Sequence, residues 1–580
     1  MNNNYNKILA IHDGHNASVC FIQGTEVVAL VNEERFTNVK NQGGFPVQSI
    51  KWILKEYHLT LSSISKIVFP HLNKIVNYEQ GKATSFERRI FETLSNFLPQ
   101  SILSNKHLFE LYGKFYGQPA RKIQIKNNFL KSFDENIKFE IVEHHLTHAY
   151  ASVATSGFLN TYDKFLVFTA DTSGDGLSST VSICNSDGEL TRVSQSSAFD
   201  SLCKMYSQIT EMMGMRPNEH EYKIMGMAPY AEKKYANDIC NILTELVFFD
   251  EKSETFKSDF PYGAPAVKKL HKLLYKKRFD SIAAGTQLHF EQMIQQWINH
   301  WVSKTGIKVS VFGGGGFMNV KSNMLISKQA QLDDCYFCPS SGDESTSLGA
   351  AYFEYLKTYK SREPFTPIGN LYLGREYSDR QISKELKQWD EIFHFIKCDD
   401  INLEVARFLE KGEVIARFNG REEWGARALG NRSILCRPDN PILVNVLNKK
   451  IKMRDFWMPF ACSILDEHAQ EYFKDYDGKS DQFMMKTYTV KESKIKNLVA
   501  GVHPFDGTCR AQVVRKNTTP EYWDLLEKFT ELSGISALLN TSFNLHGKPI
   551  VGSIDDALST IHQSGVKYLA IGNYFVTKKK

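Results

Sequence analysis

The sequence predicts an α/β protein of two domains, the first of which contains a duplicated unit. Three observations favour this fold class. With 580 residues, the chain is longer than one hydrophobic core ordinarily organises. One series of elements (strand, acidic or glycine-containing turn, strand, turn, strand, helix) occurs twice in its first half. A stretch rich in proline, glycine and polar residues at 362–377 then marks a boundary, which predicts domains at 1–368 and 369–580.

The first copy of the series begins close to the start of the chain. Apolar runs predict its three strands at residues 7–11, 18–23 and 27–32. Turns containing Asp13-Gly14 and Gly24-Thr25 separate these strands, and a helix is expected at 46–57. The stretch 86–131, rich in phenylalanine, leucine, lysine and glutamate, is interpreted as a helical insertion without chemistry.

The second copy begins with the apolar strand 165–170, which ends at Asp171. A turn containing Gly174 and Gly176 leads to two further strands and to a helix that begins near residue 200. Two such copies in one chain are typical of the actin/hexokinase-type ATPases, in which a nucleotide lies in the cleft between the two halves. Two unrelated β-meanders would give the same pattern, so that alternative stays open.

Two histidines have the spacing of metal ligands. His144 and His148 stand four residues apart where a helix is expected to begin, so both imidazoles project from one face. Such a pair can hold a metal ion when carboxylates converge on it, whereas an isolated pair on a surface helix carries no function. The candidate carboxylates are Asp171, at a strand end, and Asp343, for which helix capping is the alternative role.

A run of four glycines follows the apolar strand 308–312. Gly314, Gly315 and Gly316, with Asn319 beyond them, let the backbone approach a ligand closely, and the next helix start offers free N–H groups to a phosphate. The spacing matches neither a Rossmann fingerprint nor a P-loop. A flexible turn is the alternative interpretation.

Composition and charge argue against several classes of partner. A net charge of +5 gives no basis for a nucleic-acid or membrane surface, and the basic stretch 268–278 has leucines at helical spacing, as a solvated helix face does. No apolar run approaches the length of a membrane span. Ten scattered cysteines, a lone Cys335/Cys338 pair and a polar start indicate a reduced, cytoplasmic protein. The oligomeric state stays open.

Cationic and polar loops gather in the second domain. Arginine forks suit phosphate and carboxylate oxygens, and glycines let the chain turn tightly around such a ligand. The predicted anion-binding side chains are Arg421, Arg427, Arg432, Lys452, Arg454, Arg510, Asn540, Ser542 and Asn544. Solvated surface charge is the alternative for any one of these loops.

Taken together, the motifs resemble the O-carbamoyltransferases of the nodulation-factor, tobramycin and cephamycin type over nearly the whole chain. The matching stretches are His15-Asn16-Ala17-Ser18, Glu33-Glu34-Arg35-Phe36-Thr37, His144 with His148, residues 221–226, residues 420–434, Lys452 with Arg454, residues 540–544, and Gly547 with Pro549. The resemblance implies a TsaD-like first domain of the actin/hexokinase type and a YrdC-like second domain that forms carbamoyl-adenylate.

The resemblance implies that ATP, with Mg²⁺, and carbamoyl phosphate are co-substrates. In the family, a lysine–arginine pair and a serine–asparagine pair would hold ATP and a one-carbon acid. The matching residues here are Lys452, Arg454, Ser542 and Asn544. Carbamoyl phosphate would lose its phosphate, and the resulting carbamate would attack the α-phosphate of ATP. The other four arginines of the loops would neutralise the charge that builds up on the phosphates.

For the first domain, the resemblance implies a metal ion, with Fe(II) favoured over Mn(II) or Zn(II). Its ligands would be His144, His148, Asp171 and Asp343. The glycine run would hold the nucleotide. His15 would take the proton from the acceptor, a hydroxyl of a sugar or secondary metabolite, since an unperturbed imidazole has a pKa of about 6.5. Three positions depart from the family: Asn16 replaces a common aspartate, Ala426 replaces a common proline, and Met458 stands where some relatives carry an arginine before the proline.

Three rival functions remain open at this stage. The first is a transferase acting in tRNA threonylcarbamoylation or hydrogenase maturation, which usually uses separate chains or needs zinc-binding cysteine pairs. The second is a metabolite kinase on the duplicated ATPase fold, and the third is a catalytically silent nucleotide-binding regulator. Nucleotide products distinguish them, because carbamoyl-adenylate formation yields pyrophosphate and AMP whereas a kinase yields ADP.

Overall fold

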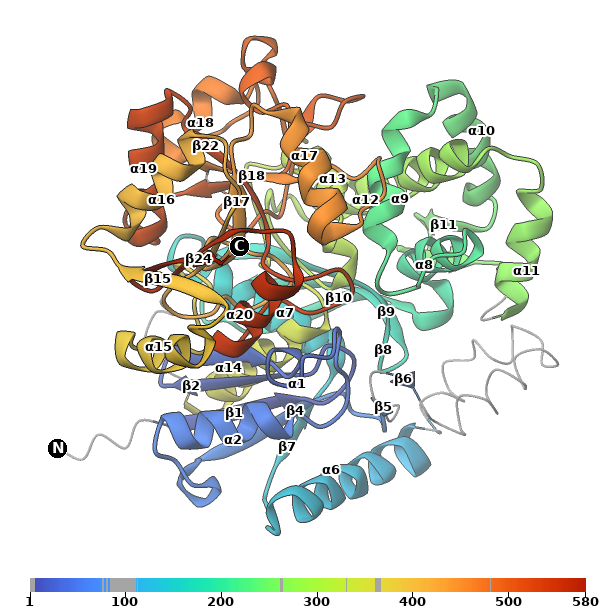
Figure 1. Cartoon of the computed structure of the whole chain (residues 1–580). Helices are drawn as coiled ribbons and strands as arrows, with labels where there is room; N and C mark the ends of the chain where they lie inside the picture. Colours follow the sequence, from blue (N-terminus) through green and yellow to red (C-terminus); the bar gives the residue numbers. More distant parts are fainter. Residues whose placement is uncertain are drawn as a thin grey trace. The chain divides into compact units, whose positions relative to one another are not determined.

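The computed structural model describes residues 6–75, 78–79, 82–83, 111, 113–260, 264–329, 331–359, 367–479 and 481–579. The chain forms two compact units, whose elements are labelled in Figure 1. The first unit comprises Met1–Ala29 and Gln42–Pro367, and the second comprises Leu30–Asn41 and Ile368–Lys580. A short early segment of the chain is therefore grouped with the second unit.

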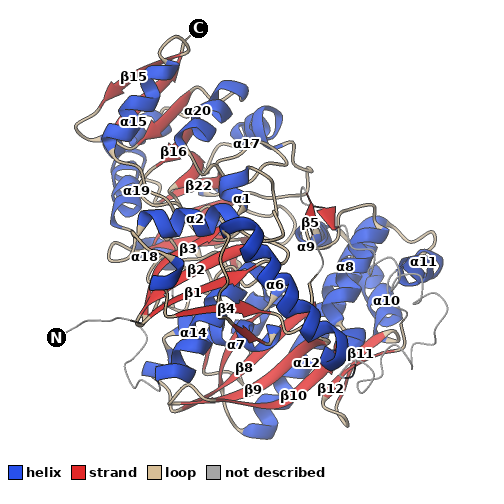
Figure 2. Ribbon diagram, turned by 90° about the horizontal axis from the view of Figure 1, so that it is seen from below, coloured by secondary structure: helices blue, strands red, loops and turns tan. Residues whose placement is uncertain are grey.

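Two five-stranded sheets organise the first unit, and both have the same strand order. Figure 2 labels β1 to β4 of the first sheet and β8 to β10 of the second. The first, β3-β2-β1-β4-β7, consists of β1 (Lys7–His12), β2 (Ser18–Gln23), β3 (Glu26–Asn32), β4 (Lys66–Pro70) and β7 (Glu140–Val142). The second, β10-β9-β8-β13-β14, consists of β8 (Lys164–Gly174), β9 (Leu177–Asn185), β10 (Leu190–Ser197), β13 (Val309–Gly313) and β14 (Asp334–Phe337). The central strands, β1 and β8, each have one antiparallel and one parallel neighbour. This repeat confirms the predicted duplication.

Two helices connect these sheets. Helix α7 (His144–Ser156) packs on β8 and β13, helix α14 (Thr346–Tyr359) packs on β1, β2 and β4, and the two helices pack against each other. Their close approach depends on a small residue, because a side chain at Gly349 would collide with the carbonyl of Thr147. The packing brings the start of α7 near the short turn η7 (Asp343–Ser345) that precedes α14.

The other elements of the first unit lie around this frame. Its remaining helices are α2 (Val47–Glu56), α6 (Gln118–Phe133), α8 (Leu202–Met212), α9 (Glu221–Met227), α10 (Lys233–Thr244), α11 (Ala264–Leu273), α12 (Phe279–Thr305) and α13 (Val320–Ser327). Two small hairpins pair β5 (Tyr78–Glu79) with β6 (Lys82–Ala83) and β11 (Val247–Asp250) with β12 (Thr255–Ser258). Of the predicted helical insertion 86–131, the part up to residue 110 lies outside the described residues, and the last part is α6.

The second unit is a mixed sheet covered by helices on both faces. In the order β15-β24-β23-β16-β17-β22-β18-β21, its strands are Phe393–Lys397, Tyr574–Lys578, Tyr568–Ile571, Ile415–Phe418, Arg432–Cys436, Ala537–Ser542, Ala461–Leu465 and Ala511–Val514. Helices α16 (Ile401–Glu410) and α19 (Pro520–Ser533) contribute to one apolar core. Helices α15 (Asp379–Leu386), α17 (Pro441–Leu447) and α20 (Ile554–Gln563) contribute to the other.

Two short helices and a two-stranded sheet also belong to the second unit. Helix α1 (Glu34–Thr37) lies in the early segment of the second unit, α18 (Asp466–Tyr472) follows β18, and β19 (Tyr488–Thr489) pairs with β20 (Thr508–Cys509). No helix in the described part of the chain combines the length and apolar character needed to cross a membrane. Both units are mixed α/β, as predicted.

Candidate functional site

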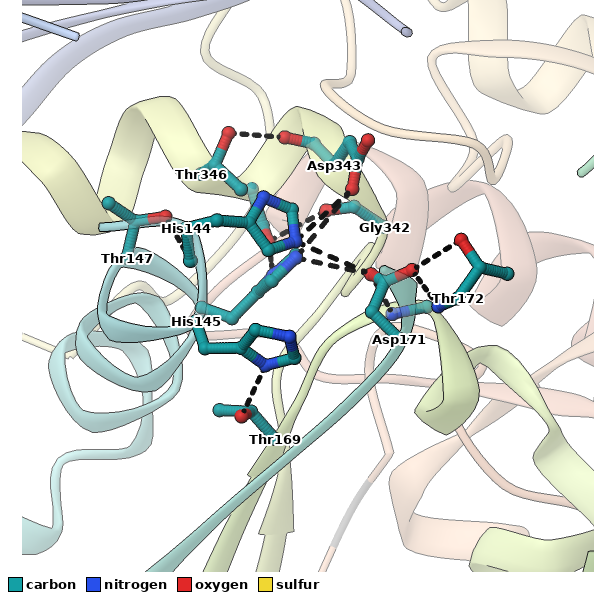
Figure 3. A network of polar contacts seen from close by, with 12 residues as sticks. His144, His145, Thr147, Thr169, Asp171, Thr172, Gly342, Asp343 and Thr346 are labelled. Atoms are coloured by element: carbon teal, nitrogen blue, oxygen red, sulfur yellow. Dashed lines mark hydrogen bonds and ion pairs between the residues drawn. The ribbon is translucent and has the colours of Figure 1, made fainter. Parts of the chain in front are cut away.

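Four predicted metal-ligating side chains converge in the first unit (Figure 3). One donor atom from each of His144, His148, Asp171 and Asp343 lies within 4.8 Å of the others. The Nε2 atom of His148 is 3.2 Å from Asp171 Oδ2 and 3.7 Å from Asp343 Oδ1. The Nε2 atom of His144 is 4.0 Å and 3.9 Å from the same two oxygens. We call these four residues the histidine–aspartate cluster.

Local contacts fix the start of α7, the ring of His144 and the carboxylate of Asp171. Glu143 caps α7 by accepting hydrogen bonds from the backbone N–H groups of His145 and Leu146, so the helix begins at His144. The ring of His144 packs against the backbone of Gly174, where any side chain would collide with it. Asp171 is held from the other side, since its Oδ2 accepts from the N–H of Gly315 at 3.0 Å.

The electrostatics of the cluster couple its members strongly. Burial disfavours the charged imidazole of His148, but the carboxylates of Asp171 and Asp343 outweigh burial and raise its pKa to about 9. Burial likewise opposes ionisation of Asp171, yet His148 and His144 hold the pKa of this carboxyl below its ordinary value. Opposite charges thus stabilise one another where little water reaches them.

The residues fit a bound divalent cation. The Nε2 atoms of His144 and His148 are buried and have no hydrogen bond of good geometry among the described residues. Nitrogen and oxygen ligands bind such cations at about 2.1 Å, which spaces neighbouring ligand atoms roughly 3–4 Å apart. Two imidazoles and two carboxylates are a ligand set suited to Fe(II), Mn(II) or Zn(II).

The neighbouring histidine, His145, points elsewhere. Its Nδ1 lies 2.8 Å from the hydroxyl of Thr169, within the core under β8 (Figure 3). Burial lowers the pKa of His145 to about 3, so this imidazole is neutral. His145 is a core histidine.

His15, the predicted base, lies in the turn between β1 and β2. Its backbone carbonyl is 2.7 Å from Nε2 of His12, and the next residue, Asn16, has a left-handed backbone with φ of 56°. Its charge interacts with Glu344, the residue that follows Asp343 in η7. His15 is therefore within electrostatic reach of η7, whereas its catalytic role stays a prediction.

The glycine run follows β13 and is packed tightly against β8. Gly314 has φ of 91°, and a side chain there would collide with the carbonyl of Ala170. The N–H of Gly315 faces Asp171, while Gly316 packs against Ala170 and Cys203. The Asn319 side chain caps α13 and exchanges two hydrogen bonds with Gln287. Close packing alone thus accounts for these glycines, and nucleotide binding by them stays a prediction.

Lys452 is the centre of a second cluster, in the second unit. Its ammonium group donates to the Ser542 hydroxyl at 3.1 Å and to Asn544 Oδ1 at 2.6 Å, and it also contacts both backbone carbonyls. These are the serine and asparagine predicted to act with it. Burial and the nearby charges of Arg454 and Lys40 lower the pKa of Lys452 well below its ordinary value. We call Lys452, Ser542 and Asn544 the lysine cluster.

Three arginines lie near the lysine cluster and near each other. Burial and the charges of Arg427 and Arg454 lower the pKa of Arg510 well below its ordinary value, and Arg454 acts on Lys452 as well. Half-buried positive charges gathered in this way favour binding of a multiply charged anion.

The other predicted anion ligands have structural contacts. Arg432 is fully buried, stacks on Phe418 and donates to backbone carbonyls, including that of Asn419 at 2.6 Å. Arg421 donates to the carbonyls of Leu373 and Gly374. Asn540 is buried, and its amide nitrogen contacts Ala428, Ser463 and Gln512. These contacts hold loop 420–434 in place, and ligand binding by the three residues stays a prediction.

Residues 33–37, one of the stretches that resemble the family, contact loop 420–434. Arg35 is buried, donates to the carbonyl of Gly425 at 2.8 Å and lies 3.7 Å from the carboxylate of Glu422. Arg375 stacks on Phe36 with its guanidinium carbon 4.2 Å from the ring centre. No local sequence pattern indicates these contacts, since they join residues more than 330 positions apart.

Three residues near the histidine–aspartate cluster were not predicted to matter. Arg121 forms a buried two-pronged ion pair with Asp13, at 2.6 and 2.9 Å. Asp175 accepts a hydrogen bond from the N–H of His144, and His71 packs on the His144 ring. The Gly174-Asp175-Gly176 turn was a visible signal for Asp175, but nothing in the sequence marks Arg121 or His71.

Two family descriptions match the chain. Residues 7–352 match the carbamoyltransferase N-terminus, and residues 406–578 match the carbamoyltransferase C-terminus. The chain belongs to the carbamoyltransferase family. It is therefore an enzyme whose reaction is carbamoyl transfer, as the sequence motifs predicted.

Relatives of this carbamoyltransferase are similar along nearly its whole length. Nodulation protein NolNO of Sinorhizobium fredii is 28% identical over 97% of this chain and 79% of its own. The uncharacterized protein MJ1051 of Methanocaldococcus jannaschii is 30% identical over 99% of this chain and 100% of its own.

Among solved structures, the phosphate- and nucleotide-bound HypF is 12% identical, covers 61% of this chain and 47% of its own, and has a TM-score of 0.30. The ROK hexokinase of Thermus thermophilus is 11% identical, covers 60% and 99%, and has a TM-score of 0.29.

Proposed function

We propose that this carbamoyltransferase is ATP-dependent and transfers the carbamoyl group to a hydroxyl of a sugar or secondary metabolite through carbamoyl-adenylate. The adenylate would form in the second unit and react in the first. The observation that carries the proposal is the opposite chemistry of the two clusters. One gathers imidazoles and carboxylates as a cation requires, and the other gathers a lysine and arginines as phosphates require.

The lysine cluster supports adenylate formation. Water would release inorganic phosphate from carbamoyl phosphate, and an oxygen of the resulting carbamate would attack the α-phosphorus of ATP. A new O–P bond forms as the bond to the leaving pyrophosphate breaks. Lys452 is already oriented by Ser542 and Asn544, so little reorganisation precedes ligand binding. Arg454 and Arg510 would stabilise the charge on the leaving group.

The histidine–aspartate cluster supports the transfer step. A divalent cation bound by His144, His148, Asp171 and Asp343 would polarise an oxygen of its ligand, and we favour Fe(II) because of the family resemblance. The acceptor oxygen would form a bond to the carbamoyl carbon while the bond from that carbon to the AMP oxygen breaks. His15 would take the hydroxyl proton. The glycine run and Asn319 would lie along the nucleotide.

Product analysis tests this function. The protein is incubated with Mg·ATP and carbamoyl phosphate, and AMP, ADP and pyrophosphate are quantified. We expect pyrophosphate to appear with AMP, and only when carbamoyl phosphate is present. Formation of ADP would instead indicate a kinase, and no consumption of ATP would indicate a nucleotide-binding regulator. Either result would overturn the proposal.

The base assignment has its own test. The variant His15→Ala is expected to form pyrophosphate normally, because adenylate formation belongs to the second unit, and to lose carbamoyl transfer by about 100-fold or more. A panel of sugar alcohols and amino sugars, followed by mass spectrometry for an added carbamoyl group, supplies the acceptor. Transfer at the native rate by this variant would show that His15 is not the base.

A further inference from the structure

A row of imidazoles continues outward from the histidine–aspartate cluster. The ring centres of His148 and His144 are 4.6 Å apart, those of His144 and His71 are 4.6 Å apart, and those of His71 and His12 are 5.2 Å apart. Nε2 of His12 in turn contacts the carbonyl of His15. The row therefore joins the turn that carries the proposed base to the proposed metal ligands, and His71 contacts a ring on each side.

His71 carries a buried polar atom without a partner. The residue is 9% exposed, and its Nε2 has no hydrogen-bond partner among the described residues. The Nδ1 atom of His12 is in the same condition. Buried nitrogens in proteins are nearly always satisfied, and leaving one unpaired costs free energy comparable to a lost hydrogen bond. Two such atoms beside one cluster indicate that a bound molecule completes their hydrogen bonding.

The backbone of His71 is held in a conformation that few side chains adopt. Its φ of 71° lies in the left-handed region, which few residues other than glycine adopt, although asparagine, aspartate and histidine occur there more often than the rest. Strain of this kind persists where the surroundings impose it, and it concentrates at functional sites. The position of the His71 ring is thus maintained at a cost by its neighbours.

Two charged side chains, the half-buried Asp175 and the fully buried Arg121, hold this loop in place. Asp175 accepts hydrogen bonds from the N–H groups of Leu72 and Asn73, at 2.8 and 3.0 Å, and from that of His144 at 2.9 Å. Arg121 donates to the carbonyls of Pro70 and His71 and is itself fixed by its ion pair with Asp13. One carboxylate therefore holds the backbone of His71's loop and that of a proposed metal ligand in a single arrangement.

We propose that His71 is a ligand-binding residue of the first unit and that its imidazole donates a hydrogen bond to a phosphate oxygen of a nucleoside monophosphate group bound beside the histidine–aspartate cluster. This inference rests on the proposed function, in which an adenylate occupies that site. An imidazole has at least one N–H to donate in either protonation state, and a phosphate ester presents several oxygens that need donors.

The test uses AMP as the ligand and Mn(II) as a paramagnetic probe. Mn(II) bound at the cluster broadens the ³¹P resonance of AMP only when the phosphate lies close to it. The variant Lys452→Ala, which removes the lysine of the other cluster, shows whether AMP bound there contributes to the broadening. The loss variant is His71→Gly, which removes the donor and also relieves the left-handed strain, so it is expected to fold. The rescue variant is His71→Asn, which tolerates this backbone and keeps an N–H donor.

We expect His71→Gly to weaken AMP binding in this assay by about 10- to 100-fold, the usual effect of losing a hydrogen bond to a charged group. His71→Asn should recover most of the affinity. Mn(II) affinity, measured by electron paramagnetic resonance, should be unchanged in both variants. The matched control is His58→Gly, since His58 is an exposed histidine with φ of 51° in the same unit, and it should behave as the native protein.

Several outcomes would overturn the inference. Native AMP affinity in His71→Gly would mean that His71 does not contact the phosphate. Loss of Mn(II) binding would mean that His71 acts only by supporting His144. Absence of Mn(II)-dependent broadening in the native protein would remove this inference and the first-unit half of the proposed function together. Adenylate formation is measured separately by pyrophosphate release, so its failure is distinguishable.

Discussion

The histidine–aspartate cluster of the first unit and the lysine cluster of the second differ in how their charges are balanced. In the first, positive and negative groups face each other within 4.0 Å, and His148 is pushed toward its charged form by two carboxylates. In the second, burial and the neighbouring cations push Lys452 toward its neutral form, and the oxygens that accept its hydrogen bonds carry no charge. We therefore expect the first cluster to bind a cation and the second to bind an anion.

The clusters also differ in what holds them together. The first depends on packed elements, because both imidazoles project from one helix and the carboxylates come from the irregular last part of β8 and from η7, which precedes α14. The second depends on hydrogen bonds between Lys452, at the end of the short helix Asn448–Lys452, and two residues at and just beyond the end of β22. We therefore expect the first to respond to changes in helix packing and the second mainly to loss of individual side chains.

The largest predicted effect is on the lysine cluster. Lys452→Ala should reduce pyrophosphate formation from ATP and carbamoyl phosphate by about 1000-fold or more, because the side chain is a pre-oriented charge beside the reacting phosphates. Mn(II) binding by the first unit should not change. The exposed Lys496→Ala is the matched control. Equal loss in both variants would contradict the specific role of Lys452.

Next in size is the effect of removing one carboxylate from the histidine–aspartate cluster. Asp171→Asn should weaken Mn(II) binding by about 100-fold, since a neutral amide replaces a charged ligand, and should leave pyrophosphate formation intact. Calorimetric titration with Mn(II) measures the first, with the exposed Asp187→Asn as control. If Asp171→Asn abolished pyrophosphate formation too, the two clusters would not be functionally separate.

A third prediction concerns how the stability of the protein changes with pH. It compares His289, a buried histidine that is neutral, with His148, which the cluster pushes toward its charged form. His289 is almost fully buried on α12, its Nε2 lies 2.7 Å from the carbonyl of Val247, and burial lowers its pKa to about 4. In the unfolded chain the imidazole of His289 takes up a proton near pH 6.5. The neutral, buried imidazole therefore contributes fully to the stability of the folded protein above pH 6.5, and this contribution is lost as the pH falls toward 4. The loss approaches about 3 kcal/mol.

The measurement is thermal or urea unfolding of the metal-free protein between pH 7 and pH 4.5, compared with the variant His289→Gln. The variant lacks the titrating group and should lose less stability over this range than the native protein. Hydrogen exchange along α12 assigns the effect to the first unit. Identical pH profiles would show that protonation of His289 is not coupled to unfolding.

The smallest predicted effect tests the dependence of the first cluster on helix packing. Gly349→Ala places a methyl group against the carbonyl of Thr147, so α7 and α14 must separate slightly. We expect a loss of about 1–3 kcal/mol in stability, as for overpacked cores, and roughly 10-fold weaker Mn(II) binding. Gly369→Ala, which meets only ordinary van der Waals contact in the second unit, is the control. Unchanged Mn(II) affinity would show that the ligands tolerate movement of α7.

Periodicity and residue order made much of the first unit predictable. Strands β1, β2 and β3 were foreseen because apolar runs alternate with turns at Asp13-Gly14 and Gly24-Thr25, and the repeat of this order revealed the duplication. The spacing of His144 and His148 likewise follows from the geometry of a helix. The same kind of reasoning could name Asp171 and Asp343 only as candidates, since each lies far from the histidines in sequence.

The sequence by itself determined the family, the fold class and the chemical types of side chain that gather at each cluster, because these depend on local patterns and ordered motifs. Only the tertiary structure decided which of those side chains meet, since contacts such as Arg35 with Glu422 or Asp175 with His144 depend on how distant segments pack. It also decided that Arg432 and His145 are occupied by core contacts. The physical reason is that burial depends on the packing of distant segments, and burial decides whether a charged side chain can bind a ligand or is occupied by contacts within the protein.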